Sequence, residues 1–253
     1  MAAKTDGRQV RWDSHNQARR QHILDAAIGV LADAEPGSEV HVQQIADRAG
    51  LSRTVVYRHF SDRADLDAAV QGRALELLRA ELVPVLSFEG TPVDIIRRIV
   101  SAYVGWASEH PSLHEFAQQD PPGSDPGQME RAIQQIAGQI EDLINVGVEV
   151  LHVDLADDEV AALDPLVFGL VGGVFTSTRR WLSRPERRPS RETFVELATE
   201  AVWLQIAGMA RQRGVELDPD VPVEQLLDAA LDGVATGVAN GVANGVALDR
   251  AAG

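Results

Sequence analysis

Apolar residues recur at intervals of three and four along most of this 253-residue chain. This spacing is typical of one buried face of an α-helix, and we find no convincing run of alternating residues that would predict a β-strand. The first helical segment contains five such residues: Ile23, Ala26, Ala27, Val30 and Leu31. Ahead of it, Ser14 and Gln17 form a capping box, which predicts that the helix begins just after Ser14. The pattern as a whole predicts an all-α protein.

Two short helices are predicted next, separated by a tight turn. After the helix-ending sequence EPGSE, an amphipathic segment carries four inward-facing residues: Val42, Ile45, Ala46 and Ala49. Gly50 can adopt the positive φ that such a turn requires, and Ser52 is a suitable N-cap for a third helix beginning at Arg53. Val56 and Phe60 are four residues apart and therefore share the apolar face of that helix.

Further helices are predicted throughout the rest of the chain. A long helix runs from Ser61 or Asp62 to Pro84, and Thr91 suits the N-cap of the next one. Later helices are expected in four regions: around Leu113 and Phe116, from Ile133 to Ile144, at about 158–182 and at about 190–213. Pro165 marks either a kink in one of these helices or its true start.

The C-terminal end has a different composition. A short amphipathic helix at about 222–232 is followed by the repeat GVATGVANGVANGVA. Each glycine within a helix costs about 1 kcal/mol, so the repeat predicts a mobile tail. We therefore expect four regions: a flexible N-terminal arm (1–14), a three-helix domain (15–66), a larger helical domain (67–232) and a low-complexity tail (233–253).

The formal net charge of −15 is unevenly distributed along the chain. Residues 1–70 contain nine Lys and Arg against ten Asp and Glu, whereas residues 71–253 contain 14 against 28. Because salt screens charges beyond about 10 Å, basic groups in the first part can still meet a polyanion. The sequence contains no Cys, no signal-like apolar N-terminus and no uninterrupted apolar run of about 20 residues, so we expect a soluble cytoplasmic protein without membrane association.

Basic and aromatic residues share the polar face of the third helix: Arg53, Thr54, Tyr57 and Arg58. A short helix, a tight glycine turn and a helix of this kind form the helix-turn-helix pattern, whose second helix enters the major groove of DNA. Arg53 is placed to read guanine, and Thr54 to reach a base edge or a thymine methyl group. Tyr57 and Arg58 are placed to contact phosphates. The alternative is an ordinary solvated face of an amphipathic helix.

The stretch from Arg19 to Leu66 carries a more specific signal. It contains IADRAGLS, YRHF and DRADL in succession, and it resembles the DNA-binding domain of the TetR family of transcriptional regulators. The resemblance implies a three-helix DNA-binding domain, joined by a fourth helix to a helical ligand-binding and dimerisation domain. The family often has threonine at the position of Val55, so this chain lacks one polar contact.

The resemblance also implies roles for single residues. It places five of them on DNA, with the last on a phosphate at the start of the fourth helix: Arg53, Thr54, Tyr57, His59 and Arg63. From composition alone, a capping or packing role is the better fit for His59, and only the resemblance assigns it to a phosphate. Lys4, Arg8 and Arg11 precede the predicted first helix, where they form either an arm that reaches the DNA backbone or minor groove, or an extension without function.

In the second domain, the resemblance implies a pocket whose occupation alters DNA affinity. Seven residues are candidates to line it: Tyr103, Trp106, Phe116, Ile140, Phe168, Phe175 and Trp203. The absence of polar clusters among them favours a small lipophilic effector. For each residue the alternative is a place in the ordinary core, because apolar stripes at helical spacing are usually core.

The last two long helices resemble the family's dimerisation pair. Gly169, Gly172 and Gly173 would permit close approach of a partner helix. A homodimer matches a palindromic operator with half-sites about one helical turn apart, or a multiple of that distance. The arginine-rich stretch from Arg179 to Arg191 is either a solvated loop or a site for an anionic group.

Catalysis is not expected. His110 and His114, with Glu115, have the spacing of a metal pair, but Pro111 biases His110 away from helical geometry and no third ligand is nearby. The sequence lacks a phosphate-binding glycine loop and a serine nucleophile motif, so we expect no metal and no cofactor. We interpret the chain as a DNA-binding regulator, a repressor controlled by a small effector. The alternative is a helical ligand-binding or protein-interaction protein without sequence-specific DNA binding.

Overall fold

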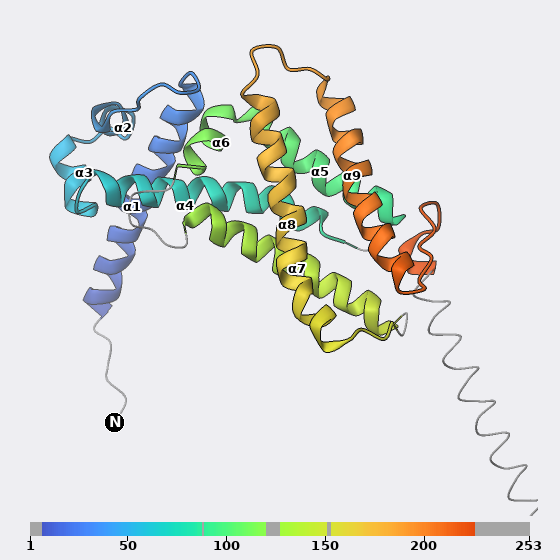
Figure 1. Ribbon diagram of the computed structural model, residues 1–253. Helices are drawn as coiled ribbons and strands as arrows, with labels where there is room; N and C mark the ends of the chain where they lie inside the picture. The colour runs from blue at the N-terminus through green and yellow to red at the C-terminus, as the bar shows by residue number, and fades with distance from the viewer. Residues whose placement is uncertain (1–6, 88, 120–126, 151–152, 226–253) are drawn as a thin grey trace, which may run out of the picture. The chain divides into compact units, whose positions relative to one another are not determined.

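The computed structural model describes residues 7–87, 89–119, 127–150 and 153–225. Over these residues the chain is helical and contains no strand, so the predicted all-α class is confirmed (Figure 1). Lys4, most of the helix predicted at 222–232 and the low-complexity tail lie outside the described residues. The elements are α1 (Gly7–Asp33), α2 (Val42–Arg48), α3 (Arg53–His59), α4 (Arg63–Leu82), the short 3₁₀ helix η1 (Val83–Val85), α5 (Pro92–Glu109), α6 (Pro111–Ala117), α7 (Gln128–Val150), α8 (Asp157–Leu182) and α9 (Arg191–Gln212).

The chain divides into two compact units. The first comprises residues 1–81 and 105–132, and the second comprises residues 82–104 and 133–253. The three-helix region therefore belongs to the first unit together with most of α4, the end of α5 and α6. The second unit contains most of α5 and α7 with α8 and α9.

Within the first unit, α1, α2 and α3 pack on one another around a small core. Its side chains are almost fully buried: Ile23, Ala27, Ile45, Ala46, Val56 and Phe60. Gly50 adopts the predicted positive φ, at 63°, and the backbone N–H of Leu51 donates to the carbonyl of Ala46 at 2.9 Å. Ser52 caps α3 as predicted, since its side chain accepts a hydrogen bond from the N–H of Val55 at 3.4 Å. The turn thereby fixes the direction of α3 relative to α2.

The start of α1 differs from the prediction. The helix begins at Gly7, seven residues before the capping box at Ser14 and Gln17. A capping box satisfies backbone donors that have no helical partner, but no proline separates Gly7 from Ser14, so the helix extends backwards instead. Arg8 and Arg11 therefore lie within α1 rather than in an irregular arm.

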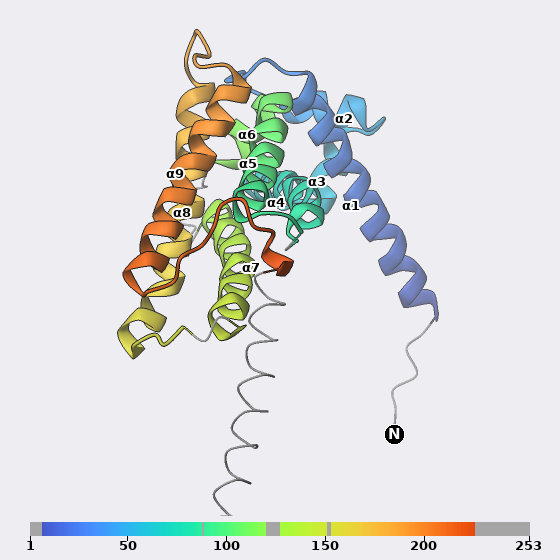
Figure 2. The same ribbon diagram turned by 90° about the vertical axis from the view of Figure 1, so that its right-hand side faces the viewer.

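In the second unit, α8 and α9 form an antiparallel pair (Figure 2). At one end, the rings of Trp181 and Phe194 stack with centroids 5.0 Å apart. At the other end, Arg213 forms an ion pair of 2.8 Å with Glu159. Pro165 lies inside α8, so it does not mark the start of that helix.

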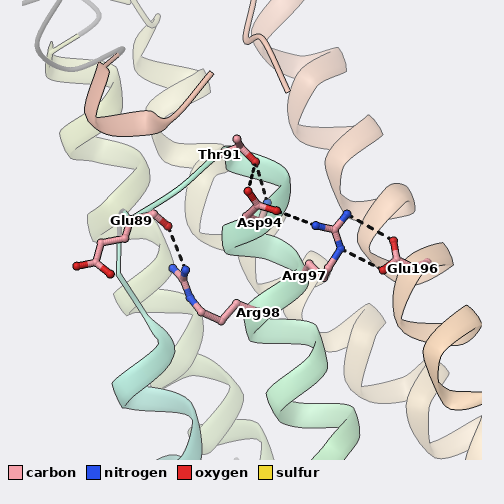
Figure 3. A network of polar contacts seen from close by, with 6 residues as sticks. All are labelled: Glu89, Thr91, Asp94, Arg97, Arg98 and Glu196. Carbon is pink, nitrogen blue, oxygen red and sulfur yellow. Dashed lines mark hydrogen bonds and ion pairs between the residues drawn. The ribbon is translucent and has the colours of Figure 1, made fainter. Parts of the chain in front are cut away.

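The N-terminus of α5 is fixed by a polar network (Figure 3). Thr91 caps the helix as predicted, because its Oγ1 accepts a hydrogen bond from the N–H of Asp94 at 3.1 Å. Arg97 connects Asp94, at 2.8 Å, with Glu196 of α9, at 3.1 Å. The guanidinium of Arg98 donates to three carbonyl groups of the preceding segment: Val85, Ser87 and Glu89. The network holds both the entry to α5 and its position beside α9.

Much of the apolar surface of α8 is not covered by the described residues. Among the described residues, α8 alone is long and apolar enough, by length and composition, to cross a membrane, although no uninterrupted apolar run predicted this. Only 17% of its apolar window is buried. One such helix is weak evidence for a membrane span, because helices of soluble proteins pass the same test. The apolar surface that α8 leaves uncovered is therefore open to a partner.

The arginine-rich connection between α8 and α9 is exposed. Arg188 lies 3.2 Å from Glu186, and Arg191 lies 3.6 Å from Glu192. Trp181 donates its indole N–H to the carbonyl of Pro189 at 2.9 Å, which ties the connection to the end of α8. Neighbouring carboxylates thus offset part of the positive charge, in agreement with a solvated loop.

Candidate nucleic-acid interface

The face of α3 opposite its buried residues presents the predicted basic and aromatic side chains. Arg53, Thr54 and Arg58 are exposed, and Tyr57 is half-buried. The guanidinium of Arg53 lies over the ring of Tyr57, 5.6 Å from its centroid. Val56 anchors the opposite face and is fully buried. The structure therefore brings these four candidates together on one helix of only seven residues.

The C-terminal end of α3 is joined to α1 by Arg20. The Nη1 of Arg20 donates to the carbonyl of His59 at 2.5 Å, and its guanidinium lies 4.1 Å from the centroid of the Phe60 ring. Arg20 also lies 3.7 Å from Asp65 of α4. A single side chain thus holds together α1, α3 and α4, the helices that position the exposed basic and aromatic face of α3.

Sequence reasoning missed Arg20, although a signal was present. Arg20 is three residues before Ile23 and seven before Ala27, so it lies on the buried face of α1. A charged residue on such a face is rarely buried without partners. The position of Arg20 on the buried face of α1 was therefore the signal, in the sequence, that its side chain makes a structural contact.

The environment of His59 disfavours its charged form. Partial burial lowers the pKa of His59 below its ordinary value of 6.5, and the nearby positive charges of Arg19 and Arg20 lower it further. The free protein therefore favours a neutral imidazole at this position. A phosphate placed beside the ring would act in the opposite direction and favour the charged form.

Arg63, the sixth candidate, has a different setting. It is the first residue of α4, and its Nε donates to Asp67 at 2.7 Å. It also lines a cavity of about 260 Å³ together with Leu31, Val40 and Phe116. A phosphate contact by Arg63 must therefore compete with an ion pair that is already formed.

The seven candidates for the effector pocket fall in both compact units. Trp106 and Phe116 belong to the first unit, whereas the other five belong to the second: Tyr103, Ile140, Phe168, Phe175 and Trp203. The rings of Tyr103 and Phe175 stack with centroids 4.1 Å apart. Burial raises the pKa of Tyr103, so its hydroxyl group stays protonated. The structure thus brings two of the seven into direct contact.

His110 and His114, the two histidines with the spacing of a metal pair, lie at the start of α6 and within it. His110 precedes α6 and has φ −125° and ψ 55°, which are not helical angles. His114 is buried within α6, and both rings lie near Trp106, with centroid distances of 5.6 and 6.5 Å. The two imidazoles pack around an indole rather than sharing a regular helix face.

The three-helix unit matches a known family. Residues 23–70, which include α2, α3 and the start of α4, match the family model described as bacterial regulatory proteins, tetR family. A relative named as an HTH-type transcriptional regulator and a solved tetR-family regulator extend the likeness over 85% and 84% of the chain. The N-terminal helices of the chain form a DNA-binding domain of the TetR family of transcriptional regulators.

Three comparisons describe how far this regulator resembles known proteins. An HTH-type transcriptional regulator of Mycobacterium tuberculosis is 26% identical over 215 residues, which cover 85% of this chain and 88% of the relative. A tetR-family transcriptional regulator from Streptomyces coelicolor aligns with a TM-score of 0.61 and 21% identity, over 84% of this chain and 99% of that chain. RolR in complex with the ligand resorcinol aligns with a TM-score of 0.55 and 17% identity, over 83% and 100%. The structural likeness supports the fold alone.

Proposed function

We propose that this TetR-family regulator is a cytoplasmic repressor that binds a palindromic operator as a homodimer and releases it when a small effector binds the larger helical domain. The observation that carries the proposal is the exposed basic and aromatic face of α3, presented by a capped helix after a tight turn. Such a helix fits the major groove with its N-terminal residues nearest to the bases.

The position of each side chain on α3 suggests its role. Arg53 and Thr54 occupy the first two positions and are exposed, which suits contacts to base edges. Tyr57, Arg58 and His59 follow towards the C-terminal end, where phosphate contacts would fix the register on the duplex. Arg63 is proposed to join them on a phosphate, in exchange for part of its pairing with Asp67.

A second copy of the chain is the proposed cover for the apolar surface of α8 and α9. Three leucines on these helices are strongly exposed, at 46%, 54% and 62%: Leu166, Leu197 and Leu204. A Cβ atom added at Gly169, Gly172 or Gly173 meets no atom of the described residues within 4 Å. Because these glycines are not needed for close packing within one chain, they support the close approach of a helix from a second copy.

The proposed effector is small and lipophilic, and it binds among the aromatic and apolar residues of the second unit. Tyr103 and Phe175 supply stacked rings there, and Phe168, Ile140 and Trp203 are only half-buried within the single chain. RolR, which has a similar fold, has been solved with resorcinol, a small aromatic molecule. That precedent supports an aromatic ligand for this fold without identifying the one used here.

The first experiment measures binding of the purified protein to the DNA upstream of its own coding region, at low and moderate salt. Scrambled DNA of equal length is the control. Selective binding that weakens as salt rises is expected, because phosphate neutralisation releases counterions. The same assay then screens small aromatic and aliphatic molecules for release of the DNA. Equal, weak binding to operator-region and scrambled DNA, repeated across genomic fragments, would favour the alternative of a helical protein without sequence-specific DNA binding.

A further inference from the structure

The N-terminal half of α1 extends beyond the core of the three-helix unit (Figures 1 and 2). The first buried side chain of α1 in the described residues is Ile23, although the helix begins at Gly7. His15 and the three residues that follow it are exposed. From Gly7 to Arg19 the helix rises about 18 Å, at roughly 1.5 Å per residue.

This part of α1 differs in charge from the rest of the protein. Residues 7–22 contain four arginines and two histidines against the single carboxylate Asp13, whereas the whole chain has a net charge of −15. Five basic positions recur at intervals of three and four: 8, 11, 15, 19 and 22. At about 100° per residue they fall within an arc of roughly 80°, on one face of the helix. We call these five positions the basic stripe of α1.

The stripe leads towards the recognition helix. The Nε2 of His22, the last position of the stripe, lies 2.9 Å from the carbonyl oxygen of Ala49, just before the turn that leads into α3. The charge of Arg19 also lowers the pKa of His59 at the other end of α3. One end of the stripe therefore lies beside the turn and α3, where DNA contacts are proposed. The other end continues away from α3 along the extension.

A helix of this composition needs a partner to be stable. Residues 7–18 contain few apolar side chains, and a helix that is polar on nearly all sides gains little from packing. Short helices without packing are marginal in water. A partner of opposite charge would offset this, and few apolar residues are present for a protein interface. The composition favours a polyanion.

We propose that the basic stripe of α1 is a second DNA-binding surface, which contacts the phosphate backbone of the duplex flanking each operator half-site. The inference rests on the proposed DNA-binding function and extends its footprint. An extension of about 18 Å spans roughly five base pairs at 3.4 Å each. Because only phosphates are contacted, the stripe adds affinity and salt dependence without adding base preference.

The test compares the wild type with the double variant Arg8→Gln/Arg11→Gln, which keeps helix propensity high and leaves the surroundings of α3 unchanged. Both are measured by fluorescence anisotropy on two duplexes: the operator trimmed to its half-sites, and the same operator with ten flanking base pairs on each side. The control Arg79→Gln/Arg187→Gln removes two exposed arginines from α4 and from the connection between α8 and α9. Far-ultraviolet circular dichroism checks that each variant is folded.

On the flanked duplex, we expect the double variant to bind more weakly than the wild type. Its salt slope should be smaller by roughly 1.8 per protomer, at about 0.9 for each phosphate that is no longer neutralised. Its preference for operator over scrambled DNA should be unchanged, and the trimmed duplex should show little difference. If the wild type is selective but the variant retains its full affinity and slope on the flanked duplex, the stripe does not bind DNA and the proposed function stands. If the wild type itself shows no operator preference, the proposed function fails.

Discussion

Arg53 is the residue on which base recognition is most sharply predicted. It is the first residue of α3, and its exposed guanidinium lies over the ring of Tyr57. Arg53 therefore gives up few contacts within the protein when it binds a base. Arg53→Ala should cost about 1–3 kcal/mol on the operator and relax preference at one base pair. Competition binding with operators substituted one pair at a time measures this, with Arg79→Ala as the control. An equal loss on every sequence would instead assign Arg53 to a phosphate.

His59 should make operator binding depend on pH. Its pKa is lowered in the free protein by partial burial and by Arg19 and Arg20, whereas an adjacent phosphate would raise it. DNA binding then takes up a proton, so affinity should increase as the pH falls from about 8 to about 6. Titrations at several pH values should show a shallower dependence for His59→Gln than for the control His110→Gln. Parallel curves for the wild type and His59→Gln would show that the ring does not contact phosphate.

The lowered pKa of His59 also makes the stability of the free protein depend on pH, in the direction opposite to DNA binding. Because the folded state favours the neutral ring, the unfolded chain binds more protons in the window between the lowered pKa of His59 and its ordinary value of 6.5. The contribution of His59 to the free energy of unfolding is therefore present above about pH 6.5 and is lost as the pH falls below it. DNA binding and folding thus respond to protonation of this residue in opposite directions.

At the scale of elements, two glycines should respond oppositely to the same substitution. Gly50 has a φ of 63° in the turn before α3, and in the part of the chain that the structure describes an added Cβ would meet no atom within 4 Å. Gly50→Ala should therefore cost about 1–2 kcal/mol, from backbone conformation alone. Gly105 lies inside α5 with similar free space, so Gly105→Ala should stabilise the protein by about 0.5–1 kcal/mol. Urea denaturation followed by circular dichroism measures both, and destabilisation of similar size at the two sites would contradict the argument.

Local sequence motifs predicted helix starts and turns correctly where the backbone at one position needs a particular residue type. Gly50, Ser52 and Thr91 each satisfy a specific donor or dihedral angle, and each was found in the predicted role. The capping box at Ser14 was wrong because a capping motif does not prevent helix upstream of it. Periodicity likewise identified the buried face of α1 but not the partners that Arg20 finds there, since partners depend on tertiary packing.

At the scale of the whole molecule, sequence predicted the class of fold and the family but not which apolar residues meet. Trp106 is only three residues from Tyr103, yet the two belong to different compact units. An apolar stripe indicates burial, and the identity of its neighbours comes from topology that periodicity does not encode. The charge pattern was more informative, because the acidic excess beyond residue 70 favours the first part of the chain as the place for a polyanion.

The assembly of two chains provides the last prediction. Leu204 is 62% exposed on α9, and Leu197 lies seven residues earlier on the same face. If a second copy covers this face, Leu204→Glu places a carboxylate in an apolar interface and should cost about 3 kcal/mol or more, roughly a 100-fold rise in the dimer dissociation constant. Analytical ultracentrifugation measures that constant, and Gln205→Glu adds the same charge on the adjacent face as the control.

Comparing a palindromic operator with an isolated half-site distinguishes dissociation of the dimer from damage to the DNA-binding helices. A dimer gains affinity on a palindrome because its second half-site is bound at high effective concentration. Leu204→Glu should therefore lose affinity for the palindrome while it binds an isolated half-site as well as the wild type does. Weaker binding to the half-site as well would mean that the substitution disturbs the fold. An unchanged dimer would mean that some other surface joins the chains, and the exposed leucines of α8 and α9 would then need a different partner.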